Sequence, residues 1–588
     1  METTQVPVLI VGAGPVGTTI ANLLGVYGVR ALVIERSAAI HDYPRAVGLD
    51  DEALRTFQAA GLCRQMLRDM IQNVPMRLYG ARKECLAEIQ PTTREFGFFR
   101  RNLFSQPLGE ATLRAGLGRF PHVEMRLGVE LLDLAQDADG VTATVRAADG
   151  TRSAIRAQYL VGCDGGRSTV REGILKLPFE GKTHAHKWAV LECEDDPLDA
   201  PYTALHCEPA RPYVCLRLPY GLRRWEFMLF PGEDAEQMLS PEKVQALLRA
   251  HVADPSKLKI IRARVYTHNS RVAGSFVVGR ICLAGDAAHI TPPWIGQGLN
   301  AGLRDAFNLA WKLAWIVQGR LQPALLQSYH DERHAHARAM IDLADLFGAV
   351  LSQRNRLVAW ARDRLLLSLR AIPRLRDYVL QMRFKPMPRY EQGIVQESGR
   401  RSDDAAVGRM FIQPMVESGG EVRHLDDIVQ SRFVLLSWRC DAMAGAGTPL
   451  LDQLAQLKVV RICAVRSRSG AHEVPQPAGA CPSTLLVEDA EGQLDGWFKE
   501  HGVDWVLLRP DRYVAAMGLA KEATQRLGAL CDVLLPPLSA LESALESAQL
   551  AAASISHAQS SASQADAAHH SALSAAAGVP LAADAHGR

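Results

Sequence analysis

The glycines of the run Gly12-Ala13-Gly14-Pro15-Val16-Gly17 are the first residues in the chain whose spacing points to chemistry. This G-x-G-x-x-G follows an apolar run, Val6–Val11, that is typical of a buried parallel strand, and it opens a predicted helix. The first glycine permits a tight turn, the second lets the backbone approach a pyrophosphate, and the third lets the helix pack closely on the sheet. The spacing therefore predicts a dinucleotide site with its phosphate at a helix N-terminus.

The next predicted strand, Ala31–Ile34, leads directly into Glu35 and Arg36. A carboxylate at this position accepts hydrogen bonds from the adenosine ribose of a dinucleotide, so we expect Glu35 and Arg36 to contact the ligand. The alternative is a glycine turn without a ligand, but strand, helix and Glu35 together argue against it. These residues fit FAD and NAD equally well, so later segments must decide between the two.

A second strand-end carboxylate lies in the middle of the chain, where the predicted strand 281–285 ends in Gly285-Asp286. It leads into the run Pro292-Pro293-Trp294-Ile295-Gly296-Gln297-Gly298-Leu299-Asn300 and then into a predicted helix. We expect Asp286 to meet ribityl or pyrophosphate groups, and the backbone N–H groups near Gly298–Asn300 to face an electron-rich ring edge. The prolines would stiffen this loop, and its glycines would let backbone approach the ring.

A third motif, Cys163-Asp164-Gly165-Gly166-Arg167-Ser168-Thr169-Val170-Arg171, follows another predicted strand. Together the three motifs closely resemble those of the single-component FAD-dependent aromatic hydroxylases, the para-hydroxybenzoate hydroxylase-like group. The resemblance covers roughly residues 5–385. It implies FAD as the cofactor, a role for Asp164 towards both FAD and the pyridine nucleotide, and FAD contacts from Arg45 and Gln106.

The resemblance also implies the reaction and its partners. NADH, with NADPH left open, would reduce the flavin, and O2 would then supply the oxygen atom. Within the group, the Pro292–Asn300 run looks like that of enzymes acting on 3-(3-hydroxyphenyl)propionate. We therefore expect ortho-hydroxylation of a phenolic acid, this one or 3-hydroxycinnamate, to the 2,3-dihydroxy product in aromatic catabolism.

The residues that would bind this small aromatic acid are less defined by the sequence. A carboxylate would need an arginine or a backbone N–H, and the expected substrate sheet offers four arginines without a basis for choosing among them: Arg211, Arg217, Arg223 and Arg224. His289 is a candidate for phenol deprotonation, because histidine is a common general base, although a histidine that only packs or hydrogen-bonds is the stronger interpretation. Pro292 and Pro293 complete the predicted catalytic residues.

Other functions remain open at this point. A phenol hydroxylase with a resorcinol-like substrate would carry the same motifs, as would an epoxidase of the same fold. A halogenase is disfavoured because its Trp-x-Trp-x-Ile-Pro motif is missing. A non-catalytic flavin-binding protein that uses its C-terminal region for interactions belongs to a different class.

The predicted fold is α/β, with a Rossmann-like FAD-binding domain that is interrupted by a β-sheet substrate domain. The predicted parts are an FAD-binding domain at 1–180 and 276–390, a β-rich substrate domain at 181–275, a thioredoxin-like domain at 395–540 and an Ala/Ser-rich tail at 541–588. A long helical segment is expected from about 299 to 385. The thioredoxin-like domain has Cys440 without a second cysteine at 443, so we expect packing or homodimer formation from it rather than dithiol chemistry.

Composition limits the partners. The formal net charge of +2 gives no field that would attract nucleic acid or an anionic membrane. A signal peptide and an apolar stretch long enough for a transmembrane helix are both missing, which predicts a cytoplasmic protein. None of the 11 cysteines forms a C-x-x-C pair. His330, His334 and His336 lie on a charged helical stretch without the spacing of a zinc site, which predicts a solvated helix face, so no metal is expected.

Overall fold

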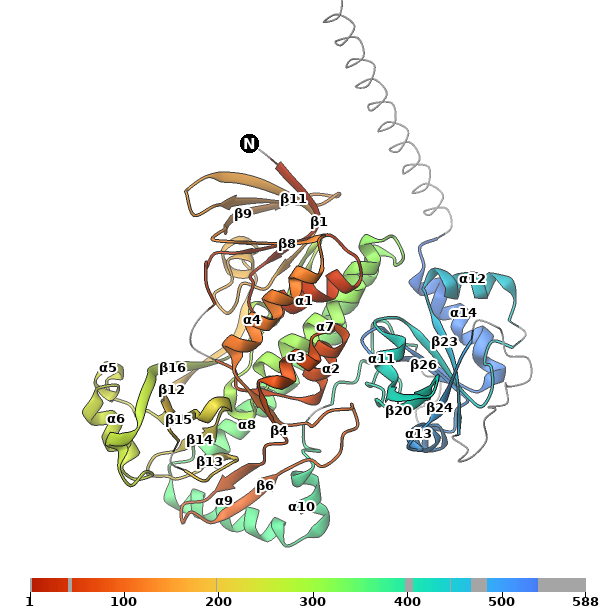
Figure 1. Ribbon diagram of the computed structural model, residues 1–588. Coiled ribbons are helices and arrows are strands. Elements are labelled where there is room, and N and C mark those ends of the chain that lie inside the picture. Colours follow the sequence, from red (N-terminus) through yellow and green to blue (C-terminus); the bar gives the residue numbers. More distant parts are fainter. Residues whose placement is uncertain are drawn as a thin grey trace, which may run out of the picture. The chain divides into compact units, whose positions relative to one another are not determined.

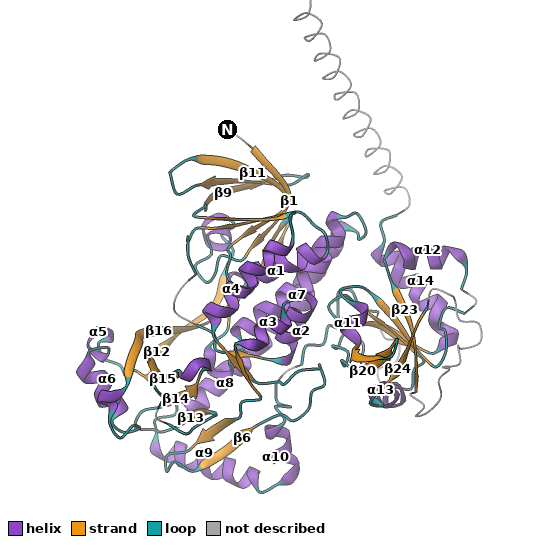
Figure 2. Cartoon of the chain, in the orientation of Figure 1, coloured by secondary structure: helices purple, strands orange, loops and turns teal. Residues whose placement is uncertain are grey.

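The computed structural model describes residues 3–40, 45–196, 198–385, 387–396, 406–444, 446–466 and 484–537. The predicted Ala/Ser-rich tail at 541–588 lies outside these residues. One compact unit spans Met1–Leu534, and its sheets and helices are drawn in Figures 1 and 2. Among the described helices, none has the length and apolar composition that a bilayer crossing requires.

The first sheet is built around parallel strands whose carboxyl ends share one edge. Its order is β17-β18-β11-β1-β2-β8, with the antiparallel pair β9 and β10 attached through β11. Neighbours from β18 to β8 run parallel, as expected for buried apolar strands that are covered on both faces. The bounds are β1 Thr3–Val11, β2 Ala31–Glu35, β8 Val123–Leu127, β9 Glu130–Gln136, β10 Val141–Arg146, β11 Arg152–Gly162, β17 Val277–Val278 and β18 Ile281–Leu283.

Two further sheets are formed by segments that alternate along the chain with those of the first. The larger has the order β19-β16-β12-β15-β14-β13-β5-β6 and is antiparallel except where β13 meets β5. Its bounds are β5 Met76–Tyr79, β6 Cys85–Ile89, β12 Phe179–Glu194, β13 Thr203–His206, β14 Tyr213–Arg217, β15 Arg223–Met228, β16 Lys259–Ala273 and β19 His289–Ile290. The smaller sheet consists of β3 Gly48–Leu49, β7 Asn102–Phe104 and β4 Met70–Gln72.

The helices of this part of the chain are led by α1 (Pro15–Val26) and α7 (Gly298–Val317), which pack side by side (Figure 1). The expected long helical segment from about 299 to 385 is confirmed as a series of separate helices, of which one begins after Asn355, which caps it, and one begins at Pro373. Proline is favoured at the first turn of a helix, where its missing N–H costs nothing. The remaining bounds are α2 Asp51–Ala59, α3 Cys63–Arg68, α4 Gln106–Gly116, α5 Ala235–Met238, α6 Pro241–Leu248, α8 Ser328–Leu351, α9 Arg356–Arg370 and α10 Pro373–Leu380.

The C-terminal domain is a separate α/β layer structure. Its sheet order is β21-β20-β24-β23-β22-β25-β26, with β22, β23 and β24 parallel, in agreement with the expected thioredoxin-like arrangement. Burial raises the pKa of Cys440, just after β22, to about 11, the opposite of an activated thiol. The bounds are β20 Met415–Ser418, β21 Glu421–His424, α11 Leu425–Val429, β22 Val434–Trp438, α12 Thr448–Gln456, β23 Val460–Arg466, β24 Leu485–Asp489, α13 Gln493–His501, β25 Trp505–Leu508, β26 Val514–Gly518 and α14 Ala523–Leu534.

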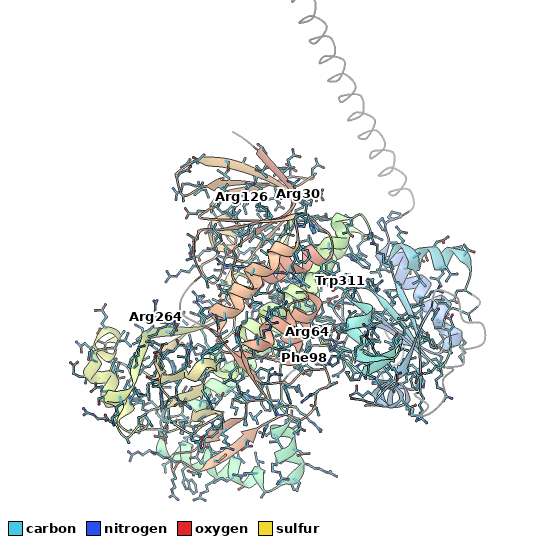
Figure 3. The ribbon with its side chains drawn as sticks, viewed as in Figure 1. Arg30, Arg64, Phe98, Arg126, Arg264 and Trp311 are labelled. Carbon is cyan, nitrogen blue, oxygen red and sulfur yellow. The ribbon has the colours of Figure 1, made fainter. Side chains whose placement is uncertain are left out.

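Buried ion pairs and ring contacts join this domain to the helices of the first. Arg509 donates to both oxygens of Glu332 on α8, at 2.7 and 2.8 Å, and both side chains are fully buried. Trp311 on α7, labelled in Figure 3, meets Phe433 edge to face at 5.5 Å. Removing one partner of such a buried pair would leave an uncompensated charge.

Candidate functional site

A cavity of about 1460 Å³ opens between the first sheet and the large antiparallel sheet. Pockets for drug-sized ligands are commonly about 300–1,000 Å³, so this one has room for a ligand larger than a single small molecule. We call its two sides the dinucleotide wall and the sheet wall. The dinucleotide wall consists of Gly12, Gly14, Glu35, Asp164, Asp286 and residues 293–300; the sheet wall consists of the lining residues of β5 and β12–β16.

The three glycines of the first motif have different roles. Gly12 has φ +107°, and a Cβ there would lie 2.4 Å from the carbonyl oxygen of Cys163. A Cβ on Gly17 would lie 2.1 Å from the carbonyl oxygen of Gly12, so this glycine lets α1 approach the turn and does not line the cavity. A Cβ on Gly14 would meet no protein atom within 4 Å. Gly14 and Pro15 therefore leave a space at the N-terminus of α1 that a ligand can fill.

Glu35 ends β2 at the rim of this turn. Its Oε2 accepts from the Ala13 N–H at 2.9 Å, and its Oε1 accepts from the Ser37 N–H at 2.8 Å. Arg36 is exposed and also lines the cavity. The carboxylate is thus fixed beside the glycine turn, where a ribose hydroxyl can donate to its remaining lone pairs.

Asp164 and Asp286 stand at the ends of β11 and β18. Burial raises the pKa of Asp164, whose carboxylate accepts from Ser168 Oγ at 2.6 Å and from the Val170 N–H at 3.1 Å. Burial also raises the pKa of Asp286, and the Arg45 guanidinium, 3.8 Å away, opposes that shift. The two carboxylates line the same cavity because parallel strands place their carboxyl ends at one edge.

Gln106 joins the Arg45 segment to α4. Its Oε1 accepts from the N–H groups of both Arg45 and Ala46 at 2.8 Å, while its Nε2 donates to Glu110 at 2.8 Å. Gln106 and Arg45 both line the cavity, where the resemblance places the FAD contacts.

The loop before α7 is held by Asn300. Its Oδ1 accepts from the Asp50 N–H at 3.0 Å, and its Nδ2 donates to the carbonyls of Gly48 and Gly296. Gly296 has φ +62°, and a Cβ there would meet no protein atom within 4 Å, so its backbone faces open space. Pro293 and Gly296–Asn300 line the cavity, and Pro292 does not.

His289 lies behind the dinucleotide wall rather than in the cavity. Its Nε2 is 2.7 Å from Asp305 Oδ2, and both side chains are buried. Arg333 donates to the other oxygen of Asp305 at 2.9 Å. This position favours the packing and hydrogen-bonding interpretation of His289 over a role in deprotonating a substrate.

The sheet wall is lined by alternate residues of three adjacent strands. Alternation brings one side chain in two to a common face, and it gives this wall an apolar centre with a charged margin. The residues are Thr203 and Leu205 on β13, Val214 and Leu216 on β14, and Arg224 and Glu226 on β15. β16 adds Arg264, Tyr266 and His268, and Figure 3 labels Arg264.

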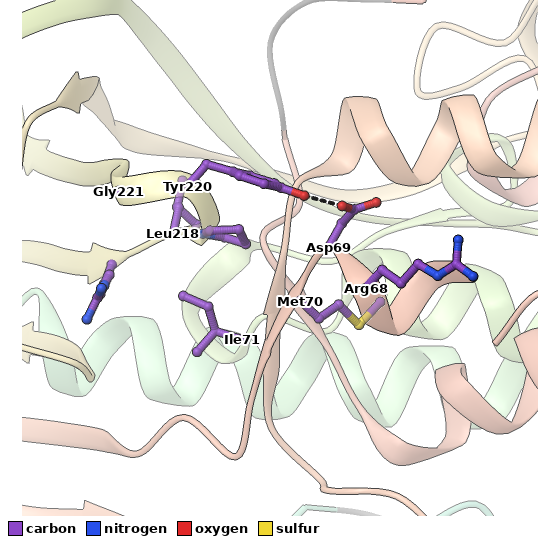
Figure 4. A pocket seen from close by; sticks show the side chains of 9 residues that line it. Arg68, Asp69, Met70, Ile71, Leu218, Tyr220 and Gly221 are labelled. Atoms are coloured by element: carbon purple, nitrogen blue, oxygen red, sulfur yellow. Dashed lines mark hydrogen bonds between the residues drawn. The ribbon is translucent and has the colours of Figure 1, made fainter. Parts of the chain in front are cut away.

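The four arginines proposed for a substrate carboxylate are separated by the structure. Arg211 pairs with Glu233, and Arg223 pairs with Asp196, both away from the cavity. Arg217 lines a different pocket of about 230 Å³, whose other residues are drawn in Figure 4. Arg224 alone of the four lines the large cavity, and Glu192 already holds it through contacts of 2.6 and 2.9 Å.

Sequence reasoning missed Arg101, Thr203, Glu226 and the β16 residues of the cavity. For β13–β15 the period-two pattern was the available signal, but it does not say which face is turned to the cavity. Arg101 stands just before a short strand and had no motif around it. His336, expected on a solvated helix face, is buried, which corrects that part of the histidine interpretation. Three carboxylates of the described residues lie close together, Asp50, Asp51 and Glu52. Asp50 and Glu52 form ion pairs with Arg304 and Lys385, and Asp51 forms one with Arg100 at 3.7 Å.

The residues on the dinucleotide wall fit FAD, because they leave glycine backbones open to the cavity beside fixed carboxylates and a helix N-terminus. A family model described as an FAD binding domain matches residues 5–344, and one described as HcaD C-terminal domain matches residues 408–533. A solved structure, a ternary complex of aklavinone-11 hydroxylase with FAD and aklavinone, has a TM-score of 0.71 at 25% identity, covering 90% of this chain and 99% of that one.

Curated relatives match most of the chain. The 3-(3-hydroxy-phenyl)propionate/3-hydroxycinnamic acid hydroxylase 2 of Burkholderia vietnamiensis (strain G4 / LMG 22486) is 52% identical over 510 residues, which cover 87% of this chain and 93% of that protein. The 3-(3-hydroxy-phenyl)propionate/3-hydroxycinnamic acid hydroxylase of Comamonas testosteroni is 43% identical over 579 residues, covering 91% and 98%. The chain belongs to the family of FAD-dependent aromatic hydroxylases.

Proposed function

We propose that this enzyme ortho-hydroxylates 3-(3-hydroxyphenyl)propionate, and 3-hydroxycinnamate, to the 2,3-dihydroxy product with NADH and O2. The observation that carries the proposal is the cavity that joins the dinucleotide wall to a sheet wall with an apolar centre and a charged margin that includes Arg224 and Arg264. Such a margin suits an acid, and the apolar centre suits its ring. The names of the relatives point to the same pair of acids.

When bound, FAD supplies the redox chemistry, taking a hydride from the nicotinamide and activating O2. Among the residues of this chain, Gly14, Glu35 and the N-terminus of α1 would hold the adenosine and pyrophosphate part of FAD. Asp286 and Arg45 would meet its ribityl and phosphate groups. The loop at 293–300, fixed by Asn300, would turn backbone N–H groups towards the ring edge.

The sheet wall would orient the substrate and exclude water. Leu205, Val214 and Leu216 offer apolar surface for an aromatic ring, and they come from rigid strands of the large sheet. A dry site favours transfer of oxygen to the substrate over its loss as hydrogen peroxide. Electron-rich rings react best, which is why a phenol is proposed. Because His289 lies behind the wall, we do not assign it a proton at the substrate.

The nicotinamide cofactor would bind transiently, since the sequence contains no second G-x-G-x-x-G. Asp164 and Gly165, which line the cavity, are the residues proposed to serve both FAD and this partner. The preference for NADH over NADPH, homodimer formation and a cytoplasmic location stay predictions.

A substrate panel tests this function. Holoenzyme would be given 3-(3-hydroxyphenyl)propionate, 3-hydroxycinnamate or resorcinol, and hydroxylated product would be measured against NADH and O2 consumed. We expect the two acids to stimulate NADH oxidation, with product formation matching consumption. Hydrogen peroxide without hydroxylated product from both acids, or full coupling only with resorcinol, would contradict the proposed substrate.

A further inference from the structure

Arg101 is a cavity arginine that lacks an acidic partner among the described residues. It lines the wall just before β7, and its Nε donates to the carbonyl of Val74 at 3.1 Å. Its two terminal nitrogens donate to no described residue, and no described carboxylate lies within ion-pair distance. Arg101 is half-buried, and partial removal from water with no compensating charge lowers the pKa of its guanidinium to about 10.

Most other arginines of the cavity are paired or solvated. Those that pair with a carboxylate are Arg45, Arg100, Arg171 and Arg224. Those that are exposed, so that water solvates their charge, are Arg36, Arg167 and Arg264. Removing a cation from water without a partner costs free energy, which an anionic ligand would offset.

Two other arginines of the cavity, Arg114 and Arg271, donate only to uncharged groups among the described residues. Arg114 donates to the carbonyl of Ala13 at 3.2 Å, which places it at the glycine turn of the dinucleotide wall. Arg271 donates to the carbonyl of Phe179 and to the hydroxyl of Thr183, at 3.1 Å each. Arg271 lies on β16 of the sheet wall, and both of its terminal nitrogens have acceptors. Arg101 differs because neither of its terminal nitrogens has an acceptor among the described residues.

The position of Arg101 is on the substrate side of the cavity. Val74, which its guanidinium contacts, packs in one apolar cluster with Leu216 and Val214 of the sheet wall. The neighbouring Asn102 donates to the Leu49 carbonyl at 3.2 Å. Asp50, the residue after Leu49, donates its N–H to Asn300 in the loop at 293–300. These hydrogen bonds connect the segment that carries Arg101 to the loop beside the position proposed for the flavin ring.

We propose that Arg101 binds the carboxylate of the aromatic acid substrate, with its two terminal nitrogens donating to the two carboxylate oxygens. The inference rests on the proposed function and names the specificity-determining group of that site. A guanidinium presents parallel donors that match a carboxylate, which a lysine ammonium does not. Arg101 would thus select acids over neutral phenols, while the apolar residues beside it accept the connecting carbons.

The experiment compares an acid with a neutral analogue of the same shape. Binding of 3-(3-hydroxyphenyl)propionate and of 3-(3-hydroxyphenyl)propionamide to the holoenzyme would be followed by the change in flavin absorbance, and turnover of both would be measured. In Arg101→Met we expect the Kd of the acid to rise about 100-fold, equivalent to about 2.8 kcal/mol, and the Kd of the amide to change less than about threefold. Arg101→Lys should retain part of the preference.

The control is Arg217→Met, since Arg217 is exposed and lines the separate pocket of Figure 4. It should leave both Kd values unchanged, and all variants should keep wild-type FAD content and the wild-type KM for NADH. Equal weakening of acid and amide, or weakening confined to FAD or NADH, overturns the inference while wild-type hydroxylation still supports the proposed function. If the wild type hydroxylates neither compound, the proposed function fails and this inference fails with it.

Discussion

The two walls of the cavity are built by opposite means. The dinucleotide wall offers backbone: glycines that carry no Cβ, a helix N-terminus and carboxylates fixed by backbone N–H groups. The sheet wall offers side chains, and its Arg224 is held by the buried Glu192 outside the cavity and by Glu226 within the wall. The first wall should therefore be sensitive to added volume and the second to lost charge.

The largest effect should come from volume on the dinucleotide wall. Gly12→Ala forces a Cβ to within 2.4 Å of backbone at φ +107°, so we expect it to disrupt the turn and lower stability together with FAD binding. Gly14→Ala adds the same methyl group where no protein atom lies within 4 Å. It should leave the apoprotein as stable as wild type and weaken FAD binding at least about tenfold. Fluorescence titration with FAD and thermal unfolding of the apoprotein measure the two quantities.

The predicted difference between the two glycines would be contradicted if Gly14→Ala bound FAD with the wild-type affinity. In that case the space at the N-terminus of α1 would not be where the pyrophosphate lies. An apoprotein destabilised equally by both substitutions would mean that the two glycines serve the fold alone.

The next effect should come from charge on the sheet wall. Glu192 is buried and accepts from Arg224 at 2.6 Å and from Arg262 at 2.6 Å. Glu192→Gln removes the carboxylate that pairs with Arg262 and leaves Arg224 with the more distant Glu226, at 3.6 Å, so we expect the free energy of unfolding to fall by about 3 kcal/mol. The control Glu233→Gln breaks the partly exposed pair with Arg211, outside the cavity, and should cost less than about 1 kcal/mol. Urea unfolding of the holoenzymes measures both, and equal losses would contradict the difference drawn between buried and exposed pairs.

Much of the dinucleotide wall could be predicted from the sequence because its information is local. A glycine turn or a Gly-Asp pair follows its strand directly, and the carboxyl ends of parallel strands must meet at one edge. The predicted strands Val6–Val11 and Ala31–Ile34 lie within β1 and β2. The motifs and the strands before them were therefore enough to predict that Asp164 and Asp286 contact the same ligand.

The sheet wall could not be predicted to the same depth. Alternation indicated β14 and β15, but a shift of one residue exchanges the two faces, and only the pairing of strands decides which face is buried. The partners of Arg211 and Arg223 are 22 and 27 residues away and depend on loops without a motif. Arg101 is distinguished by a missing partner among the described residues, and a missing partner is a property of the folded chain alone.

A pH-dependent prediction concerns the carboxylates at the start of α2, next to the dinucleotide wall. Burial, together with the nearby Asp50, raises the pKa of Asp51 from its ordinary value of 3.8 to about 7. The folded state then binds a proton more tightly than the unfolded state, so the stability due to Asp51 is present below about pH 4 and is lost as pH rises towards 7. Asp51→Asn should therefore gain stability relative to wild type between about pH 5 and about pH 8.

The matched control is the adjacent Glu52, whose pKa the ion pairs to Arg304 and Lys385 hold below its ordinary value. Glu52→Gln should lose stability at both about pH 5 and about pH 8, because its carboxylate is charged and paired throughout this range. Unfolding free energies from urea titration at the two pH values give the comparison. A variant of Asp51 whose difference from wild type does not change with pH would contradict the assignment.

The smallest functional effect should come from substitution of His289. This substitution distinguishes a residue that stabilises the dinucleotide wall from one that takes part in the reaction. Asp305 keeps the Arg333 guanidinium at 2.9 Å and the Gly285 N–H at 3.0 Å when the histidine is removed, so the carboxylate stays partly satisfied. We expect His289→Ala to lower the free energy of unfolding by about 2 kcal/mol and to leave the ratio of hydroxylated product to NADH unchanged. A fall in that ratio, with FAD content preserved, would instead mean that His289 takes part in the reaction. Chromatographic measurement of the product, together with NADH consumption, decides between these outcomes. A residue with a purely structural role changes the stability of the folded protein, but it does not change the fraction of NADH that leads to hydroxylated product.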